Sequence, residues 1–186
     1  TALGTLPKNP IAVKSIVSTS ICDKIAAEYG CEMRSVLTGF KYIGEQIAKL
    51  EAKGESDRYV FGFEESYGYL VGTYVRDKDA VVASMMICEM AAYYKSKGKA
   101  LIDVLGDIYA KYGFYLNKTL SFTFAGAKGM TRMAELMGEL RTSAPAEIGG
   151  YKVTATDDYK LSVSTDIATG AQKTIDLPKS DVITFR

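Results

Sequence analysis

The chain has 186 residues, of which 47% are hydrophobic and 24% are charged, an ordinary composition for a globular protein with one or two small cores. Its 23 Lys and Arg residues balance 22 Asp and Glu residues, and this net charge of +1 excludes nucleic acid as the main partner, because phosphate binding requires a basic excess. No apolar stretch of the sequence reaches the roughly 18 residues that would span a membrane. The absence of histidine excludes Ser–His nucleophiles and His-ligated zinc from this segment. The three scattered cysteines favour a reducing, cytoplasmic location.

Strands and helices are predicted to alternate over the first 113 residues. The strands fall at residues 11–19, 31–37 and 58–63, and the helices at residues 20–29, 40–53, 80–96 and 100–112. Ser20 is the expected N-cap of the first helix, and Asp79 that of the third. Apolar residues surround the third helix on nearly all sides, so we expect it to be largely buried.

Repeated β-α units with short connections predict a parallel sheet with right-handed crossovers. We therefore expect an α/β fold, with a three-layer domain in which helices flank a mainly parallel sheet. In such sheets, ligands bind beyond the carboxyl ends of the strands. The segments predicted at that edge are residues 18–20, 38–41 and 62–66.

The sequence changes character after residue 113. Strands are predicted at residues 119–124, 151–155, 161–165 and 182–185, a helix at residues 130–141, and a loop at residues 143–150. Helices and strands no longer alternate regularly, so we expect a partial α+β unit here. We assign residues 1–116 to one domain and residues 117–186 to a second. The chain stops at Arg186 inside an apparent strand, with no turn or partner strand after it, which we interpret as truncation of this unit.

The segment from Gly62 to Gly68, with the sequence GFEESYG, is the first candidate site. Its carboxylates and hydroxyl can accept hydrogen bonds from sugar hydroxyls. Because successive residues of an extended chain point in opposite directions, Glu64 and Ser66 can face one ligand while Glu65 faces away. A solvated acidic turn is the alternative, and the position after a buried strand favours a ligand site.

Two further segments carry weaker indications. Thr38, Gly39 and Lys41 follow the second strand, where a glycine lets the backbone approach a ligand and Lys41 could supply a cation near a phosphate. An ordinary strand-to-helix turn is the alternative that the residues alone favour. Lys78 could also approach a sugar phosphate, although helix capping and solvated charge account for its RDKD run.

The third domain of bacterial phosphoglucomutases, in the α-D-phosphohexomutase superfamily, is similar to this chain over the stretch FGFEESYGYLVGTYVRDKDAVVASMMICEMAAYYKSKGK. The resemblance includes the EES loop, the TGFK segment and the RDKD run. It continues through LPKSDVITFR, which in that family lies just before the phosphate-binding loop of the fourth domain. It therefore covers essentially the whole chain and implies domain three with an incomplete start of domain four.

The resemblance implies a four-domain parent enzyme that interconverts glucose 1-phosphate and glucose 6-phosphate through a glucose 1,6-bisphosphate intermediate. In the family, a phosphoserine loop of domain one transfers the phosphoryl group and an aspartate-rich loop of domain two holds Mg²⁺. Domain three contacts the sugar hydroxyls, and domain four holds the distal phosphate. The hexose phosphate and the remaining domains of the parent chain are therefore the expected partners.

The resemblance also implies a set of substrate-binding residues: Glu64, Glu65, Ser66, Thr38, Gly39, Lys41 and Lys78. Within this set, Glu64 and Ser66 match the sugar-hydroxyl ligands, and Glu65 is the middle residue of their loop. Thr38, Gly39 and Lys41 match the second active-site loop.

Three family motifs are missing from the sequence: a TASHNP-like phosphoserine loop, a DGDADR-like magnesium loop and an RPSGTEPK-like phosphate loop. We therefore expect no catalytic residue, metal ligand or bound cofactor in this chain, and no activity from it alone. The alternatives are a phosphomannomutase fragment and a stand-alone sugar-phosphate-binding module. A nucleotide-binding α/β domain is disfavoured, because no Gly-rich loop follows the first strand.

Overall fold

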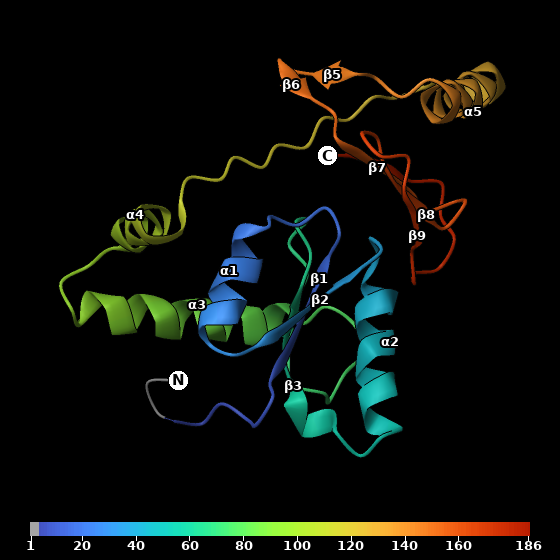
Figure 1. The fold of residues 1–186 in the computed structure, drawn as a ribbon. Coiled ribbons are helices and arrows are strands. Elements are labelled where there is room, and N and C mark those ends of the chain that lie inside the picture. The colour runs from blue at the N-terminus through green and yellow to red at the C-terminus, as the bar shows by residue number, and fades with distance from the viewer. Residues whose placement is uncertain (1–3) are drawn as a thin grey trace. The chain divides into compact units, whose positions relative to one another are not determined.

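The computed structural model describes residues 4–186. The chain divides into two compact units, with the boundary between Lys118 and Thr119. The first unit is built on one four-stranded sheet, and the second on another four-stranded sheet and a two-stranded hairpin (Figure 1).

The first unit alternates strands and helices as predicted. Its elements are β1 (Ile11–Ser15), α1 (Ile21–Glu28), β2 (Glu32–Val36), α2 (Phe40–Glu51), a 3-10 helix (Ser56–Arg58), β3 (Tyr59–Phe63), β4 (Tyr69–Val71), α3 (Ala80–Lys95) and α4 (Leu101–Tyr112). β1 ends four residues earlier than predicted because the chain turns there, with the amide of Ser18 donating to the carbonyl of Ser15 at 3.1 Å.

The sheet of the first unit has the strand order β2-β1-β3-β4. β1 is parallel to both β2 and β3, and β4 is antiparallel to β3. α1 connects β1 to β2 and α2 connects β2 to β3, in opposite directions across the sheet, so right-handed crossovers place the two helices on opposite faces. Figure 1 shows α1 and α2 on either side of the strands. The predicted α/β fold with a mainly parallel sheet and flanking helices is confirmed.

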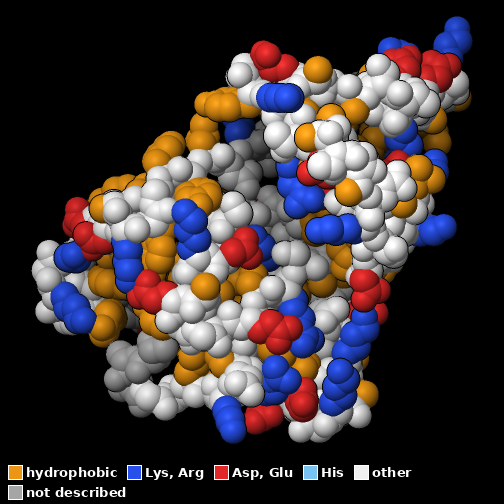
Figure 2. Space-filling model, in the orientation of Figure 1, with side chains coloured by type: hydrophobic (Ala, Val, Ile, Leu, Met, Phe, Trp, Pro, Cys, Tyr) orange, Lys and Arg blue, Asp and Glu red, His pale blue; other side chains and the backbone are white. Residues whose placement is uncertain are grey.

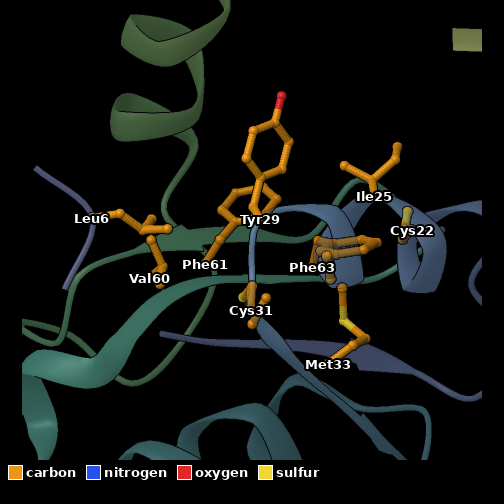
Figure 3. Close-up of a pocket in the computed structure, with 11 residues that line it drawn as sticks. Leu6, Cys22, Ile25, Tyr29, Cys31, Met33, Val60, Phe61 and Phe63 are labelled. Atoms are coloured by element: carbon orange, nitrogen blue, oxygen red, sulfur yellow. The ribbon is translucent and has the colours of Figure 1, made fainter. Parts of the chain in front are cut away.

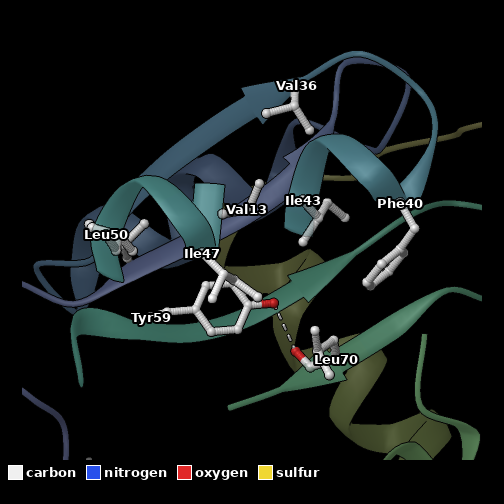
Figure 4. Close-up of a cluster of buried hydrophobic side chains, with 9 residues drawn as sticks. Val13, Val36, Phe40, Ile43, Ile47, Leu50, Tyr59 and Leu70 are labelled. Carbon is white, nitrogen blue, oxygen red and sulfur yellow. Dashed lines mark hydrogen bonds between the residues drawn. The ribbon is translucent and has the colours of Figure 1, made fainter. Parts of the chain in front are cut away.

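The core of the first unit lies between the sheet and α2 (Figure 4). It consists of Ile11, Val13, Val36, Phe40, Ile43, Ile47, Leu50, Tyr59 and Leu70. Each large apolar side chain buried in this way contributes about 1.5–3 kcal/mol. The Tyr59 hydroxyl donates to the carbonyl of Leu70 at 3.2 Å, which joins β3 to β4 inside the core, and burial raises the pKa of that phenol.

The two predicted helix caps have different outcomes. Asp79 caps α3 as predicted, because its carboxylate accepts from the amides of Val81 and Val82 at 2.8 and 3.0 Å. The prediction that Ser20 caps α1 is wrong: its side chain makes no capping bond. Ser20 already has helical backbone angles (φ −76°, ψ −5°), whereas a capping residue needs a more extended backbone to aim its side chain at the helix amides.

The prediction that α3 is largely buried is also wrong. None of its residues is buried, and Val81 and Met85 are 81% and 52% exposed. α3 packs against β4 and α4, which together are too small to cover an apolar surface that extends around the whole helix. Figure 2 shows hydrophobic side chains uncovered in the region of α3 and α4.

The second unit has a helix followed by short antiparallel strands. Its elements are α5 (Gly126–Thr142), β5 (Glu147–Ile148), β6 (Tyr151–Lys152), β7 (Ala155–Asp158), β8 (Val163–Asp166), β9 (Gln172–Thr174) and β10 (Ile183–Phe185). The larger sheet has the order β10-β7-β8-β9, and β5 pairs with β6. β10 therefore has a partner strand, β7, that precedes it in the chain.

Several predictions in this unit need correction. The predicted strand at 151–155 is interrupted at residues 153–154, which separate β6 from β7, and β7 continues beyond it to Asp158. Residues 119–124 alternate polar and apolar side chains but form no strand, because none of the described strands pairs with them and an isolated strand is not stable. The predicted loop at 143–150 contains β5, whose Gly149–Gly150 turn leads directly into β6. β9 was not predicted, because its sequence QKT has few of the residues that favour strands.

Candidate functional site

The candidate site lies at the carboxyl ends of the parallel strands, as predicted. The chain leaves β1 at Ser15, β2 at Val36 and β3 at Phe63, and these three strands are neighbours in the sheet. The segments that follow them are therefore brought to one edge of the sheet.

Glu64 joins the segment after β3 to the start of α2. Its side chain is only 6% exposed, and its Oε1 atom accepts the backbone N–H of Gly39 at 2.6 Å. Gly39 immediately precedes α2 and has φ +125°, a conformation that side chains disfavour. A carboxylate at a helix N-terminus is stabilised both by this hydrogen bond and by the helix dipole. Within the described residues, Gly39 is the donor to this carboxylate, through Oε1.

Glu65 points to a different part of the edge. Its Oε2 atom accepts from the Ser15 hydroxyl at 2.6 Å, at the end of β1. The two adjacent carboxylates therefore reach the ends of two different strands, which agrees with the alternation expected of extended chain. Sequence reasoning gave Ser15 no role. The available signal was a pair of polar residues, Lys14 and Ser15, at the end of a strand that begins with three apolar residues.

The tip of the loop is open to solvent. Ser66 and Tyr67 are exposed, and Tyr67 has φ +64°. The amide of Glu64 donates to the carbonyl of Gly68 at 2.9 Å and closes the loop behind them. The Ser66 hydroxyl is thus presented outward from a loop whose base is hydrogen-bonded.

Lys78 lies against the base of the same loop. Its Nζ atom is 5.0 Å from the ring centre of Phe40 and 3.0 Å from Oδ1 of Asp77. A Cβ atom added to Gly68 would lie 2.9 Å from Cδ of Lys78, so the lysine stem packs directly on that glycine. Gly39 and Glu64 are thus joined by a hydrogen bond, and Lys78 packs on Phe40 and Gly68, which neighbour them in the sequence and in the loop.

Thr38 and Lys41 lie at the start of α2 and are exposed. The Nζ atom of Lys41 is 4.9 Å from the ring centre of Tyr42. Thr38 precedes Gly39 and Lys41 lies in the first turn of α2, and their contact with a ligand remains a prediction.

A buried cation lies behind this edge. Lys14, in β1, is 4% exposed, and its Nζ atom is 2.7 Å from Oδ2 of Asp23 and 3.2 Å from the carbonyl of Thr19. This pairing compensates the cost of burying the charge. It also ties the start of α1 to β1, and sequence reasoning did not predict it.

The residues at this edge do not fit a magnesium ion. Over residues 4–186, no group of three or more His, Cys, Asp or Glu side chains is arranged to hold a metal. Glu64 and Glu65 bond to different partners rather than converging on one point. We therefore derive no chemical step through a metal at this site.

A cavity of about 410 Å³ lies beside α1, on the face of the sheet that is opposite α2 (Figure 3). Its walls are almost entirely apolar and include Met33, Phe61 and Phe63 from the strands and Ile25 from α1. It offers no charged group to a phosphate, so it is not a second sugar-phosphate site. Burial raises the pKa of Cys22 and Cys31, which line it, and disfavours reactive thiolates there.

The model of the domain described as "Phosphoglucomutase/phosphomannomutase, alpha/beta/alpha domain III" matches residues 1–112, which contain every residue of the candidate site. The chain belongs to the phosphoglucomutase/phosphomannomutase family. The resemblance noted from the EES, TGFK and RDKD segments is thus confirmed.

Similar proteins of this family extend the match along the chain. A phosphoglucomutase of Staphylococcus epidermidis is 37% identical over 175 residues, which is 94% of this chain and 32% of the relative. One of Staphylococcus haemolyticus is 34% identical and covers 96% of this chain and 32% of the relative. This chain therefore spans about a third of the length of these relatives.

A solved structure shows the same fold. The open form of parafusin, a phosphoglucomutase from Paramecium, superposes with a TM-score of 0.56 at 18% identity, over 94% of this chain and 28% of that one.

Within the described part of the chain, every helix is too short or too polar to cross a membrane.

Proposed function

We propose that this chain is the sugar-recognition portion of a phosphoglucomutase that interconverts glucose 1-phosphate and glucose 6-phosphate. The observation that carries the proposal is the bond between Gly39 and Glu64 at the carboxyl edge of the sheet, within the matched domain and beside the loop base on which Lys78 packs. The similar proteins named phosphoglucomutase favour glucose over mannose as the sugar.

The chemistry of these groups suits a sugar phosphate. Oε2 of Glu64 and the hydroxyl of Ser66 can each accept a hydrogen bond from a sugar hydroxyl, and the Ser66 hydroxyl can also donate one. Lys78 and Lys41 supply positive charge that can approach a phosphate. Under this proposal, the same loop contacts the sugar in both of the orientations that two successive phosphoryl transfers require.

The remaining chemistry belongs to the rest of the parent protein under this proposal. A phosphoserine loop, the Mg²⁺ site and the distal phosphate clamp would come from other domains, and residues 117–186 would be the start of domain four. Glucose 1,6-bisphosphate would be the intermediate that turns over between the two transfers. The chain alone would then bind sugar phosphate weakly and transfer no phosphoryl group.

A coupled assay on the complete protein tests the proposal. We expect conversion of glucose 1-phosphate to glucose 6-phosphate, stimulated by glucose 1,6-bisphosphate and dependent on Mg²⁺. A specificity constant higher for mannose 1-phosphate would assign the protein to phosphomannomutation instead. No turnover of either sugar phosphate would overturn the proposed function.

A further inference from the structure

Two serines at the end of β1 form a buried hydrogen-bonded pair. Ser15 is 0% exposed and Ser18 is 7% exposed, and their Oγ atoms are 2.9 Å apart. The backbone turn between them, closed by the Ser18 amide and the Ser15 carbonyl at 3.1 Å, holds the two hydroxyls side by side. From this pair, the Ser15 hydroxyl donates outward to the exposed Glu65 at 2.6 Å.

The number of available protons determines the direction of the hydrogen bonds between Ser18, Ser15 and Glu65. Each serine hydroxyl has one proton to donate, and an ionised carboxylate has none. Ser15 gives its proton to Glu65, so Ser18 must be the donor to Ser15. The hydrogen bonds therefore run in one direction, from Ser18 to Ser15 to Glu65, and end on the negative charge of Glu65, the strongest of these acceptors.

Neither packing nor solvation requires the bond to Glu65. The carboxylate of Glu65 is exposed, so water could satisfy it. Apolar residues in place of Ser15 and Ser18 would fill this turn without burying polar groups, which are costly unless they are hydrogen-bonded. What the bond adds is a fixed position for the loop that carries Glu65.

We propose that Ser15, oriented by Ser18, is a positioning residue for the sugar-binding loop. Glu64 is held at the start of α2 by the Gly39 amide, and Glu65 is held at the end of β1 by Ser15. The loop is thus anchored at two points, and Ser66 projects from it into solvent. This inference rests on the proposed function, because it concerns the same sugar loop.

An anchored loop loses less conformational entropy when it binds its ligand. The sugar contacts are present both in the bound substrate and during transfer, so loss of the anchor should weaken binding in both. Such a loss raises KM and leaves kcat nearly unchanged. A purely structural role would instead lower the melting temperature and the active fraction, without a change in KM.

The test is a double-mutant cycle in the complete protein, with KM and kcat for glucose 1-phosphate and a thermal melt for each variant. The variants are Ser15→Ala, Glu65→Ala and the double variant, with Ser35→Ala, an exposed serine of β2, as the matched control. We expect each single change to raise KM by about 5- to 20-fold, the double change to be no worse than Glu65→Ala alone, and the control to match wild type.

Effects of Ser15→Ala and Glu65→Ala that multiply would overturn the proposal, as would an unchanged KM in a folded Ser15→Ala protein. Should Ser15→Ala fail to fold, Ser18→Ala paired with Glu65→Ala gives the same cycle, and independent effects there would equally overturn it. A wild-type protein without mutase activity would overturn the proposed function and this inference together. An active wild type with independent effects would overturn the inference alone.

Discussion

Replacing Glu64 by Gln isolates the charge of the carboxylate at almost constant shape. Gln keeps an acceptor oxygen for the Gly39 amide, so the bond becomes neutral rather than disappearing. Hydrogen bonds to charged groups contribute about 1.5–3 kcal/mol and neutral ones about 1 kcal/mol, so each bond made by Glu64 loses about 1 kcal/mol. Because the side chain is 6% exposed, water does little to screen this loss.

The expected kinetic effect follows from counting the bonds. One bond goes to Gly39, and under the proposed function a second goes from a sugar hydroxyl to Oε2. The Gly39 bond is weakened in the free and the substrate-bound protein alike, so it does not enter kcat/KM. The sugar bond alone sets the loss, which is about 1 kcal/mol, or roughly 5-fold in kcat/KM within a range of about 2- to 30-fold. Both directions of the reaction should suffer alike, because both sugar orientations use the same loop. The Gly39 bond alone affects folding, so the melting temperature should fall by only about 2–8 °C.

Steady-state kinetics in both directions on the complete protein, with thermal melts, measure this. Glu45→Gln, an exposed glutamate of α2 paired with Lys49, is the matched control and should behave as wild type. Glu65→Gln and Ser66→Ala should each cost less than Glu64→Gln. A larger loss in Glu65→Gln would show that the inward-facing residue was wrongly assigned, and near-wild-type kinetics for both glutamate variants would end the sugar-binding interpretation of this loop.

Three further outcomes are expected. The purified 186-residue chain should show no mutase activity in the coupled assay, and turnover above background would contradict this. Limited proteolysis should cleave first within residues 113–125, which have no regular structure, and then degrade residues 119–186 before residues 4–118; mass spectrometry that finds the reverse order would refute it. Asp79→Ala should lower stability by about 1 kcal/mol through loss of the α3 cap, and an unchanged denaturant midpoint would show that the cap contributes nothing.

Local patterns were sufficient to predict the first unit of the fold. The apolar stripe of Ile43, Ile47 and Leu50 is fully buried against the sheet, and Asp79 caps its helix, because both depend on residues close in sequence. The strand at residues 119–124 and the burial of α3 were predicted incorrectly, because pairing and burial depend on what other segments cover a residue. An apolar pattern indicates that a helix can be buried but does not supply the surface that buries it.

The position of the candidate site in the fold could be predicted from the sequence, but the hydrogen bonds within it could be predicted only in part. The topology rule put the loops after β1, β2 and β3 at one edge. The bond from Gly39 to Glu64 joins residues 25 positions apart, and that from Ser15 to Glu65 joins residues 50 apart. Spacing in the sequence carries no information on such distances, so the anchoring of the loop emerged only from the three-dimensional arrangement.

The structure of the complete protein with glucose 1-phosphate bound is the most direct test of the sugar-binding role of this loop. We expect Oε2 of Glu64 and Oγ of Ser66 to lie about 2.5–3.2 Å from neighbouring hydroxyl oxygens of one pyranose ring, with the Gly39 bond retained. A sugar bound elsewhere, with Glu64 and Ser66 facing only water, would contradict that role.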